Sequence, residues 1–234
     1  MKFTFLLASI TALLLSACGA SETTEDQTAE KSESSSASVT VDTTINQLYV
    51  FEVWDTDATT VDSTLSASTA VINKPDLASR MVLKARNEGR VVQITTWNSE
   101  AAAEEYATDA MPDDSYKILT SKVVNHGSKD AKLAALDTTS SVQYSEFLMK
   151  RKSAVDTLST IAKGMTTAMV RSEPTLDFIM TLNSTDSSTI SLFGIWNTEE
   201  GFEVFSENNT FGDRPYWEPY ADNEHHMFEV VVAQ

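Results

Sequence analysis

Hydrophobic and polar positions along the chain follow two periods, which predicts a mixture of strands and helices. Residues 47–54 are rich in β-branched and aromatic side chains and predict a strand. Apolar residues then recur at helical spacing over 61–72, until Asn73-Lys74-Pro75 ends the helix. Two strands, 80–86 and 90–97, are separated by a short polar turn and predict a hairpin.

A helix follows this hairpin, and a strand is needed to close the first half of the chain. Asn98 stands directly after the second hairpin strand and can cap the helix. Residues 111–136 carry a weaker pattern, and we place the closing strand at 130–136. The resulting order is β-α-β-β-α-β, the order of a ferredoxin-like unit.

The second half of the chain shows the same order of elements. It opens with a strand at 142–149, and a helix follows whose apolar residues over 155–169 lie on one face. The remaining elements are strands 176–182 and 189–196, a helix after Asn197 with Glu200 placed for a capping box, and a final strand 227–233.

One motif occurs in both halves, at a fixed spacing. Trp97 and Trp196 are 196 − 97 = 99 residues apart, and three neighbouring positions are identical at the same displacement. Those positions are Asn98/Asn197, Glu100/Glu199 and Glu104/Glu203. Such self-similarity indicates one supersecondary unit built twice, which we place at 46–140 and 141–234.

The strand 190–196 is apolar on both faces. One face of this strand carries Ile190, Leu192, Gly194 and Trp196, and the other face carries Phe193 and Ile195. Both faces therefore need cover, and helices of the same half can supply only one. We expect an α+β fold in which two ferredoxin-like β-α-β-β-α-β repeats pack their sheets into one α/β barrel.

The amino terminus predicts a lipid anchor. Lys2 precedes an apolar run, 3–15, that is shorter than the ~20 residues of a membrane span. Residues 15–19, Leu-Ser-Ala-Cys-Gly, resemble a bacterial lipobox, which implies lipidation of Cys18 and removal of the signal peptide 1–18. Acyl chains contribute ~0.8 kcal/mol per buried CH₂ and would hold the protein to a lipid bilayer. Gly19, where inner-membrane lipoproteins carry Asp, resembles outer-membrane sorting, so we expect a periplasm-facing envelope protein.

Between the anchor and the first strand, residues 19–45 predict a disordered tether. They are acidic, rich in Ser and Thr, and contain no aromatic residue. Such a segment cannot bury enough apolar surface to offset the entropy of ordering.

Charge and cysteine content exclude several function classes. The net charge is −17, which repels nucleic acid and anionic lipid, so we expect neither as a partner beyond the anchor's bilayer. The charge serves solubility, or alternatively creates a field that recruits cations or a basic partner. Cys18 is the single cysteine, which excludes an intramolecular disulfide and a cysteine-based metal cluster.

The pattern strand–Trp–Asn–Ser/Thr–Glu–helix resembles the antibiotic biosynthesis monooxygenase-like group of dimeric α/β-barrel proteins. Members usually pair two chains, so the resemblance implies a monomer that contains an internal pseudo-dimer. The activities of the group include cofactor-independent oxygenation of quinol-type substrates, haem degradation and simple binding. The fold therefore does not determine the activity.

The haem-degrading members of this group place a functional Trp where Trp97 and Trp196 stand. They also need an Asn on the first strand, where this chain has Glu52 and Glu146, and a His after the second helix, where none occurs before His225. This departure argues against haem degradation. The alternative reading of each Trp is packing between a strand and a helix.

Aromatic density marks the second half as the place for a ligand. Gly194 on the strand face of Trp196 indicates space for a ligand or a close backbone approach. Phe205 and Trp217 belong to a set of aromatic residues that can line an apolar pocket with Trp196, or equally form a packed core.

Candidate bases for chemistry are His225, His226 and Tyr106. The two histidines are adjacent on a strand and face opposite ways, so they do not form a metal pair. We expect neither a metal nor a cofactor. The leading hypothesis is a lipoprotein that binds a small apolar or aromatic molecule and can oxidise it without a cofactor. The alternatives are a non-enzymatic envelope scaffold and haem binding without degradation.

Overall fold

The structure is a computed structural model, and it describes residues 39–57, 60–68, 74–109, 115–129, 135–207 and 215–234. Cys18 and the signal peptide lie outside the described residues, so lipidation and envelope location stay predictions. No helix in the described ranges combines the length and the hydropathy that crossing a membrane requires.

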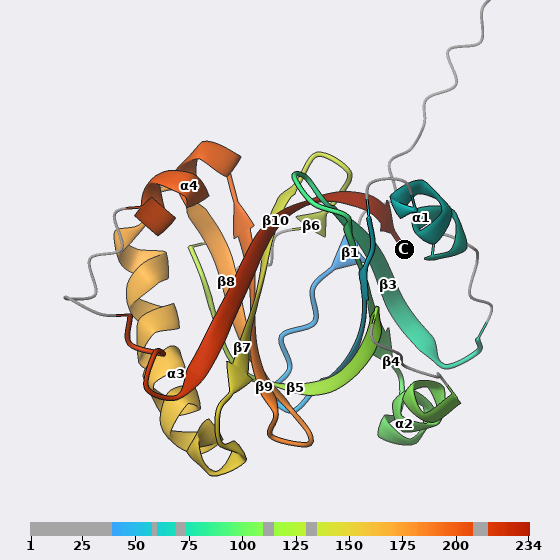
Figure 1. The fold of residues 1–234 in the computed structure, drawn as a ribbon, viewed down its shortest axis with the longest axis horizontal. Helices are drawn as coiled ribbons and strands as arrows, with labels where there is room; N and C mark the ends of the chain where they lie inside the picture. Colours follow the sequence, from blue (N-terminus) through green and yellow to red (C-terminus); the bar gives the residue numbers. More distant parts are fainter. Residues whose placement is uncertain (1–38, 58–59, 69–73, 110–114, 130–134, 208–214) are drawn as a thin grey trace, which may run out of the picture. The chain divides into compact units, whose positions relative to one another are not determined.

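The described elements follow the predicted alternation of strands and helices (Figure 1). The first half contains β2 (Leu48–Asp55), α1 (Val61–Ser68), β3 (Leu77–Ala85), β4 (Arg90–Trp97), α2 (Glu100–Asp109) and β5 (Tyr116–Ser128). The second half contains β7 (Ser141–Met149), the short η1 (Lys152–Ala154), α3 (Val155–Ser172), β8 (Leu176–Ser184), β9 (Thr189–Trp196), α4 (Glu199–Glu207) and β10 (Ala221–Ala233). A separate two-stranded sheet pairs β1 (Val39–Thr40) with β6 (Ala135–Leu136).

Eight antiparallel strands form one closed barrel, in the order β10-β3-β4-β2-β5-β8-β9-β7. Strands of the first half occupy four consecutive places, and strands of the second half occupy the other four. Two ladders join the halves, β5 with β8 and β10 with β3. The prediction of an α+β fold with one closed barrel is confirmed.

Packed side chains fill the barrel interior. The buried cluster inside it draws apolar residues from all eight strands. Phe51 and Tyr144, one from each half, stack there with their ring centroids 5.2 Å apart. The hollow lined by Tyr49, Phe51 and Phe193 encloses about 0 Å³, so it cannot admit even water. The interior is therefore core and offers no binding space at this point.

Helices cover the outer face of the barrel (Figure 1). In the second half α3 packs on β8, β9 and the neighbouring β5, and α4 packs on β9. In the first half α1 packs on β4, and α2 packs on β2, β4 and β5. The strand 190–196 has the two apolar faces that were predicted: Phe193 and Ile195 join the interior cluster, while Leu192 and Trp196 join the outer one.

Two sequence-based boundaries need correction. The strand that closes the first half is 116–128, not 130–136, of which only Ala135–Leu136 are described as a strand. Part of its cover comes from α3 of the other half, which no local periodicity reveals. The ordered part also begins upstream of residue 46, since Val39 and Val41 are buried against the barrel interior.

Candidate functional site

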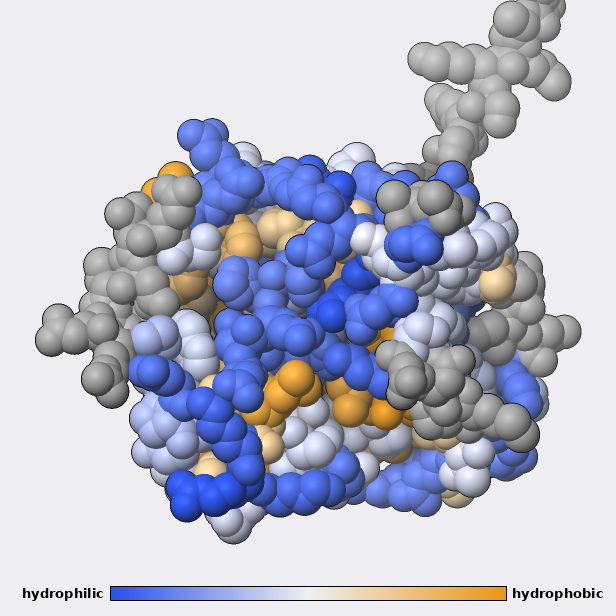
Figure 2. All heavy atoms as spheres, in the orientation of Figure 1, coloured by the Kyte–Doolittle hydropathy of each residue, from blue (hydrophilic) through white to orange (hydrophobic). Residues whose placement is uncertain are grey.

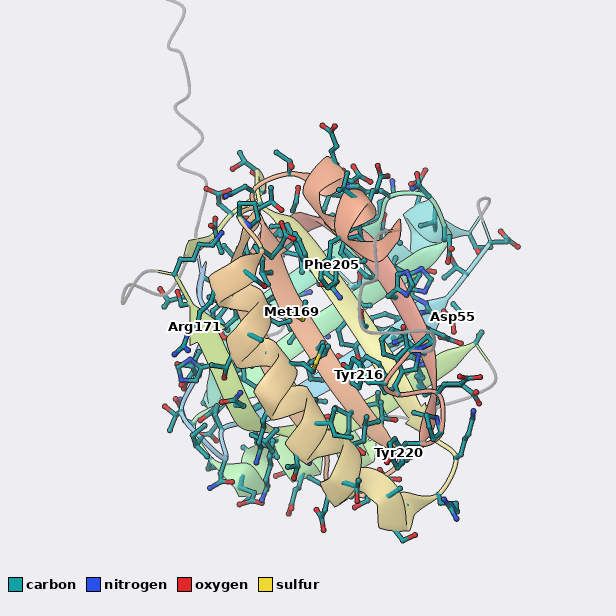
Figure 3. The ribbon with its side chains drawn as sticks, turned by 90° about the vertical axis from the view of Figure 1, so that its left-hand side faces the viewer. Asp55, Met169, Arg171, Phe205, Tyr216 and Tyr220 are labelled. Carbon is teal, nitrogen blue, oxygen red and sulfur yellow. The ribbon has the colours of Figure 1, made fainter. Side chains whose placement is uncertain are left out.

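A cavity of about 100 Å³ lies on the outer face of β7, β9 and β10, beneath α3 and α4. Figure 2 shows apolar atoms in a hollow beside the polar surface that follows β10. From the side, Met169, Phe205 and Tyr216 lie between α3 and the sheet (Figure 3). We call this hollow the aromatic cavity.

The helix side of the aromatic cavity is apolar. Met169 comes from α3, Phe205 from α4, and Tyr216 and Trp217 from the turn before β10. The rings of Tyr216 and Trp217 meet edge to face at 4.9 Å, and Trp217 meets Phe147 of β7 at 5.5 Å. Burial raises the pKa of Tyr216 to about 12, so this wall is uncharged at neutral pH.

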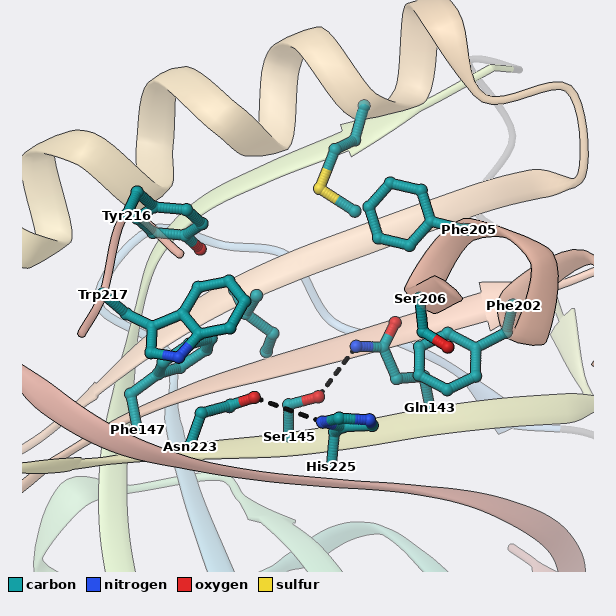
Figure 4. A pocket seen from close by; sticks show the side chains of 12 residues that line it. Gln143, Ser145, Phe147, Phe202, Phe205, Ser206, Tyr216, Trp217, Asn223 and His225 are labelled. Carbon is teal, nitrogen blue, oxygen red and sulfur yellow. Dashed lines mark hydrogen bonds between the residues drawn. The ribbon is translucent and has the colours of Figure 1, made fainter. Parts of the chain in front are cut away.

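The sheet side of the aromatic cavity is polar (Figure 4). Gln143 Nε2 donates a hydrogen bond to Ser145 Oγ at 2.7 Å. His225 Nδ1 lies 3.2 Å from Asn223 Oδ1, and the amide oxygen can only accept. The neutral imidazole therefore carries its proton on Nδ1, which leaves Nε2 as an acceptor. The cavity thus combines a mainly apolar roof with a floor that carries hydrogen-bonding side chains beside Phe147 and Leu192.

Trp196 and Gly194 support this floor from behind rather than lining it. Trp196 is 2% exposed, and its Nε1 donates to Gln143 Oε1 at 2.9 Å. A Cβ atom on Gly194 would lie 3.1 Å from Gln143 Oε1 and 3.2 Å from Trp196 Nε1. The space above the glycine is therefore taken by this hydrogen bond, which fixes the orientation of Gln143.

In the first half, a buried polar network occupies the corresponding place. Glu52 pairs with Gln93 across β2 and β4, and Ser145 pairs with Leu192 across β7 and β9. The two partners are separated by 192 − 93 = 99 residues, the displacement of the repeated motif. Glu52 and Ser145 thus hold the same ladder position, one in a network and the other in the cavity floor.

Glu52 is the centre of this network. Its carboxylate accepts hydrogen bonds from Tyr106 Oη at 2.6 Å, from Tyr116 Oη at 2.7 Å and from the Gln93 amide. Gln93 Oε1 in turn accepts from Arg80 Nε at 2.8 Å. Arg80 is fully buried and also donates to the Ser68 carbonyl. The first half therefore satisfies a buried carboxylate with donors at the ladder position where the second half has its cavity floor.

The network sets the protonation of its members. Burial, followed by the hydrogen bond to the Glu52 carboxylate, raises the pKa of Tyr106 and of Tyr116 well above the usual range. Burial lowers the pKa of Arg80. The Tyr106 hydroxyl therefore keeps its proton at neutral pH and donates it in the hydrogen bond to Glu52.

The structure separates the residues that the sequence suggested. Phe205, Trp217 and His225 come together at the aromatic cavity. His226 faces the other side of β10, where its Nδ1 lies 3.1 Å from Glu88. Trp97 and Tyr106 lie in the first half, with their rings 4.7 Å apart.

Sequence reasoning did not identify the polar floor. Gln143 and Ser145 alternate with Tyr144 along β7, so two polar residues share a face with Phe147. Polar residues at every second position of an otherwise apolar strand could have indicated this floor. Asn223 carried no comparable signal, because its role depends on the neighbouring His225.

Replacing Tyr106 with Phe should lower the free energy of unfolding by about 1.5–3 kcal/mol, the range for hydrogen bonds to charged groups. The Glu52 carboxylate would lose a donor in a buried place. Urea denaturation of the full chain measures the change. Tyr220→Phe is the matched control, because it removes a hydroxyl for which the described residues show no partner. Equal effects of the two substitutions would contradict the network.

His226 should make the protein less stable in mild acid. Burial, followed by the charge of Arg90, lowers the pKa of His226 from 6.5. Below pH 6.5 the unfolded chain therefore binds this proton while the folded chain does not. The stabilisation is complete above pH 6.5 and is lost as pH falls through the folded pKa.

Denaturation midpoints measured between pH 8 and pH 5 test this dependence. The midpoint should fall less with decreasing pH in His226→Gln than in the parent chain. His126→Gln, at an exposed position, should show the same pH dependence as the parent. A parent-like slope in His226→Gln would contradict the assignment.

Comparison of the sequence with known families and with curated proteins finds no match. The structure is similar to that of an anthrone oxidase-like protein, with a TM-score of 0.64 and 11% identity over 83% of this chain and 95% of that one. A Fusobacterium nucleatum protein provisionally assigned as a monooxygenase gives a TM-score of 0.54 and 11% identity, over 82% and 95%. A Lactobacillus acidophilus protein with the same assignment gives 0.50 and 8%, over 80% and 95%. At these identities the likeness shows the fold, which is the barrel of monooxygenase-like proteins.

Proposed function

We propose that the chain binds a small aromatic molecule in the aromatic cavity. The observation that carries this proposal is the combination of an aromatic and methionine roof with a fixed polar floor. Aromatic rings favour edge-to-face and offset contacts with a bound ring, and a thioether adapts to its shape. Gln143 and His225 can then orient a polar substituent, as a few convergent polar groups do in ligand sites.

The size of the aromatic cavity favours a ligand with one ring. Its volume of about 100 Å³ is somewhat below the roughly 150 Å³ of an engineered cavity that binds benzene. Small movements of Met169 and Phe205 would admit a ring. Drug-sized ligands occupy about 300–1,000 Å³, so a haem-sized group is not supported at this place.

We infer that the two halves are repeats of one unit and that a single chain forms the complete barrel. The common displacement of the Trp motif and of the ladder positions of Glu52 and Ser145 supports this inference. The network around Glu52 occupies the ladder position that Ser145 holds in the second half.

The scaffold alternative finds less support. Among the described residues, the large hydrophobic side chains that are exposed are Ile45 at 52% and Val204 at 50%. Two single residues do not make the contiguous apolar patch that marks a protein-binding surface.

Filling the aromatic cavity from α4 should remove binding without disturbing the core. Ser206 lines the cavity and is partly exposed. In Ser206→Phe the new ring would occupy ligand space, so affinity for the single-ring probe phenol should fall about tenfold or more, or about 1.4 kcal/mol. Ser206→Ala is the matched control and should bind like the parent. Calorimetric titration of both folded variants with phenol measures the two affinities. If Ser206→Phe binds phenol like the parent, the site lies elsewhere.

A second candidate function is oxidation of the bound molecule by O₂. Two observations favour it: His225 lines the aromatic cavity with its Nδ1 3.2 Å from Asn223 Oδ1, and the fold is similar to that of an anthrone oxidase-like protein. For a hydroquinone, His225 Nε2 would accept a phenol proton, and the resulting anion would give up electrons to O₂. Two electrons and two protons leave the ring in total, which yields a quinone and H₂O₂.

Oxygen consumption with hydroquinone tests this second function. His225→Gln should reduce the protein-dependent rate about 10²-fold, the range for loss of a general base. His126→Gln, at an exposed position on β5 outside the aromatic cavity, should leave the rate unchanged. If the parent protein consumes oxygen no faster than a solution without protein, the site binds the molecule without catalysing its oxidation.

A further inference from the structure

A second cavity, of about 160 Å³, adjoins the aromatic cavity. Phe202 and His225 line both, so these two side chains form the partition between them. Their rings meet edge to face, with centroids 5.7 Å apart. The two cavities therefore lie next to each other, on either side of these rings.

The second cavity differs from the first in its charge. Glu88, Glu199 and Glu203 line it, whereas the aromatic cavity has no charged carboxylate or ammonium group among its lining residues. We call it the acidic cavity. Two of the carboxylates come from successive turns of α4, and Glu88 comes from the turn between β3 and β4 in the other half. Closure of the barrel is what brings them together.

Neighbouring cations offset only part of this negative charge. Arg86 Nη1 lies 2.7 Å from Glu199 Oε2, which leaves the pair close to neutral. His226 Nδ1 contacts Glu88 at 3.1 Å, but burial and the charge of Arg90 lower the pKa of His226 and keep its ring uncharged at neutral pH. The acidic cavity therefore has a net negative charge, within a chain whose total charge is −17.

We propose that the ligand is an aromatic amine, with its ring in the aromatic cavity and its ammonium group in the acidic cavity. This inference rests on the proposed function and names its ligand class. An ammonium group has three donors, which match several carboxylate oxygens around one space. The face of Phe202 adds a further attraction for a cation. An anionic ligand would meet repulsion from Glu88 and Glu203.

Three probes with the same ring and chain test this ligand class: 2-phenylethylamine, 2-phenylethanol and phenylacetate. The amine should bind the full chain about tenfold more tightly than the alcohol, and phenylacetate should bind most weakly. The preference for the amine should shrink between low and high NaCl, because these carboxylates are partly exposed. Calorimetric titration gives all three affinities.

Glu203→Gln should lower the affinity for the amine about threefold, as expected for one partly exposed charge, and should leave the affinity for the alcohol unchanged. Glu104→Gln provides a matched control. It removes a carboxylate at the corresponding position of the repeated motif on α2, outside both cavities.

The outcomes separate the two proposals. If none of the three probes binds, the proposed function itself fails. If amine and alcohol bind equally well, or if phenylacetate binds best, the aromatic cavity is a ligand site but the amine assignment is overturned. An equal loss in Glu203→Gln and Glu104→Gln would also overturn it, because the effect would then come from the overall charge.

Discussion

The two ladders that join the halves, β5 with β8 and β10 with β3, are the constraint on which the rest of the structure depends. Each half presents a sheet whose inner face is apolar, and its own helices cover only the outer face. Closing the barrel buries the other face and leaves no free edge among its eight strands. Because the interior is then filled by side chains such as Phe51 and Tyr144, space for a ligand is left on the outer face, between sheet and helices.

The outer faces of the two halves solve the same packing problem in different ways. The first half buries the Glu52 carboxylate, which is satisfied by Tyr106, Tyr116 and an amide. At the same ladder position the second half has Ser145, a short side chain that leaves room above the sheet. A buried carboxylate without hydrogen-bond donors would cost several kcal/mol, so Glu52 requires the donors that surround it. In the second half, the space above Ser145 belongs to the aromatic cavity.

Much of the fold could be predicted, and part of the site. The Trp–Asn motif and its displacement indicated the order of elements, and the apolar faces of 190–196 indicated a closed barrel. The aromatic residues Phe205 and Trp217 and the candidate base His225 do meet at one cavity. The closing strand 116–128 could not be placed, because α3 from the other half supplies much of its cover. Gln143 and Asn223 could not be assigned either, since their roles depend on partners that tertiary structure brings near.

The sequence by itself determined the periodicities, the duplicated motif, the acidic charge and the two apolar faces of the strand 190–196. These properties are local or additive, so they can be counted along the chain. Tertiary structure decided which cavity stays open, which carboxylate is buried and which groups share a wall. Glu88 and Glu203, for example, are far apart in sequence and line one space only after the barrel closes. Contacts of that kind arise from pairing between strands that are distant in sequence. The periodicity of a single segment therefore cannot predict them.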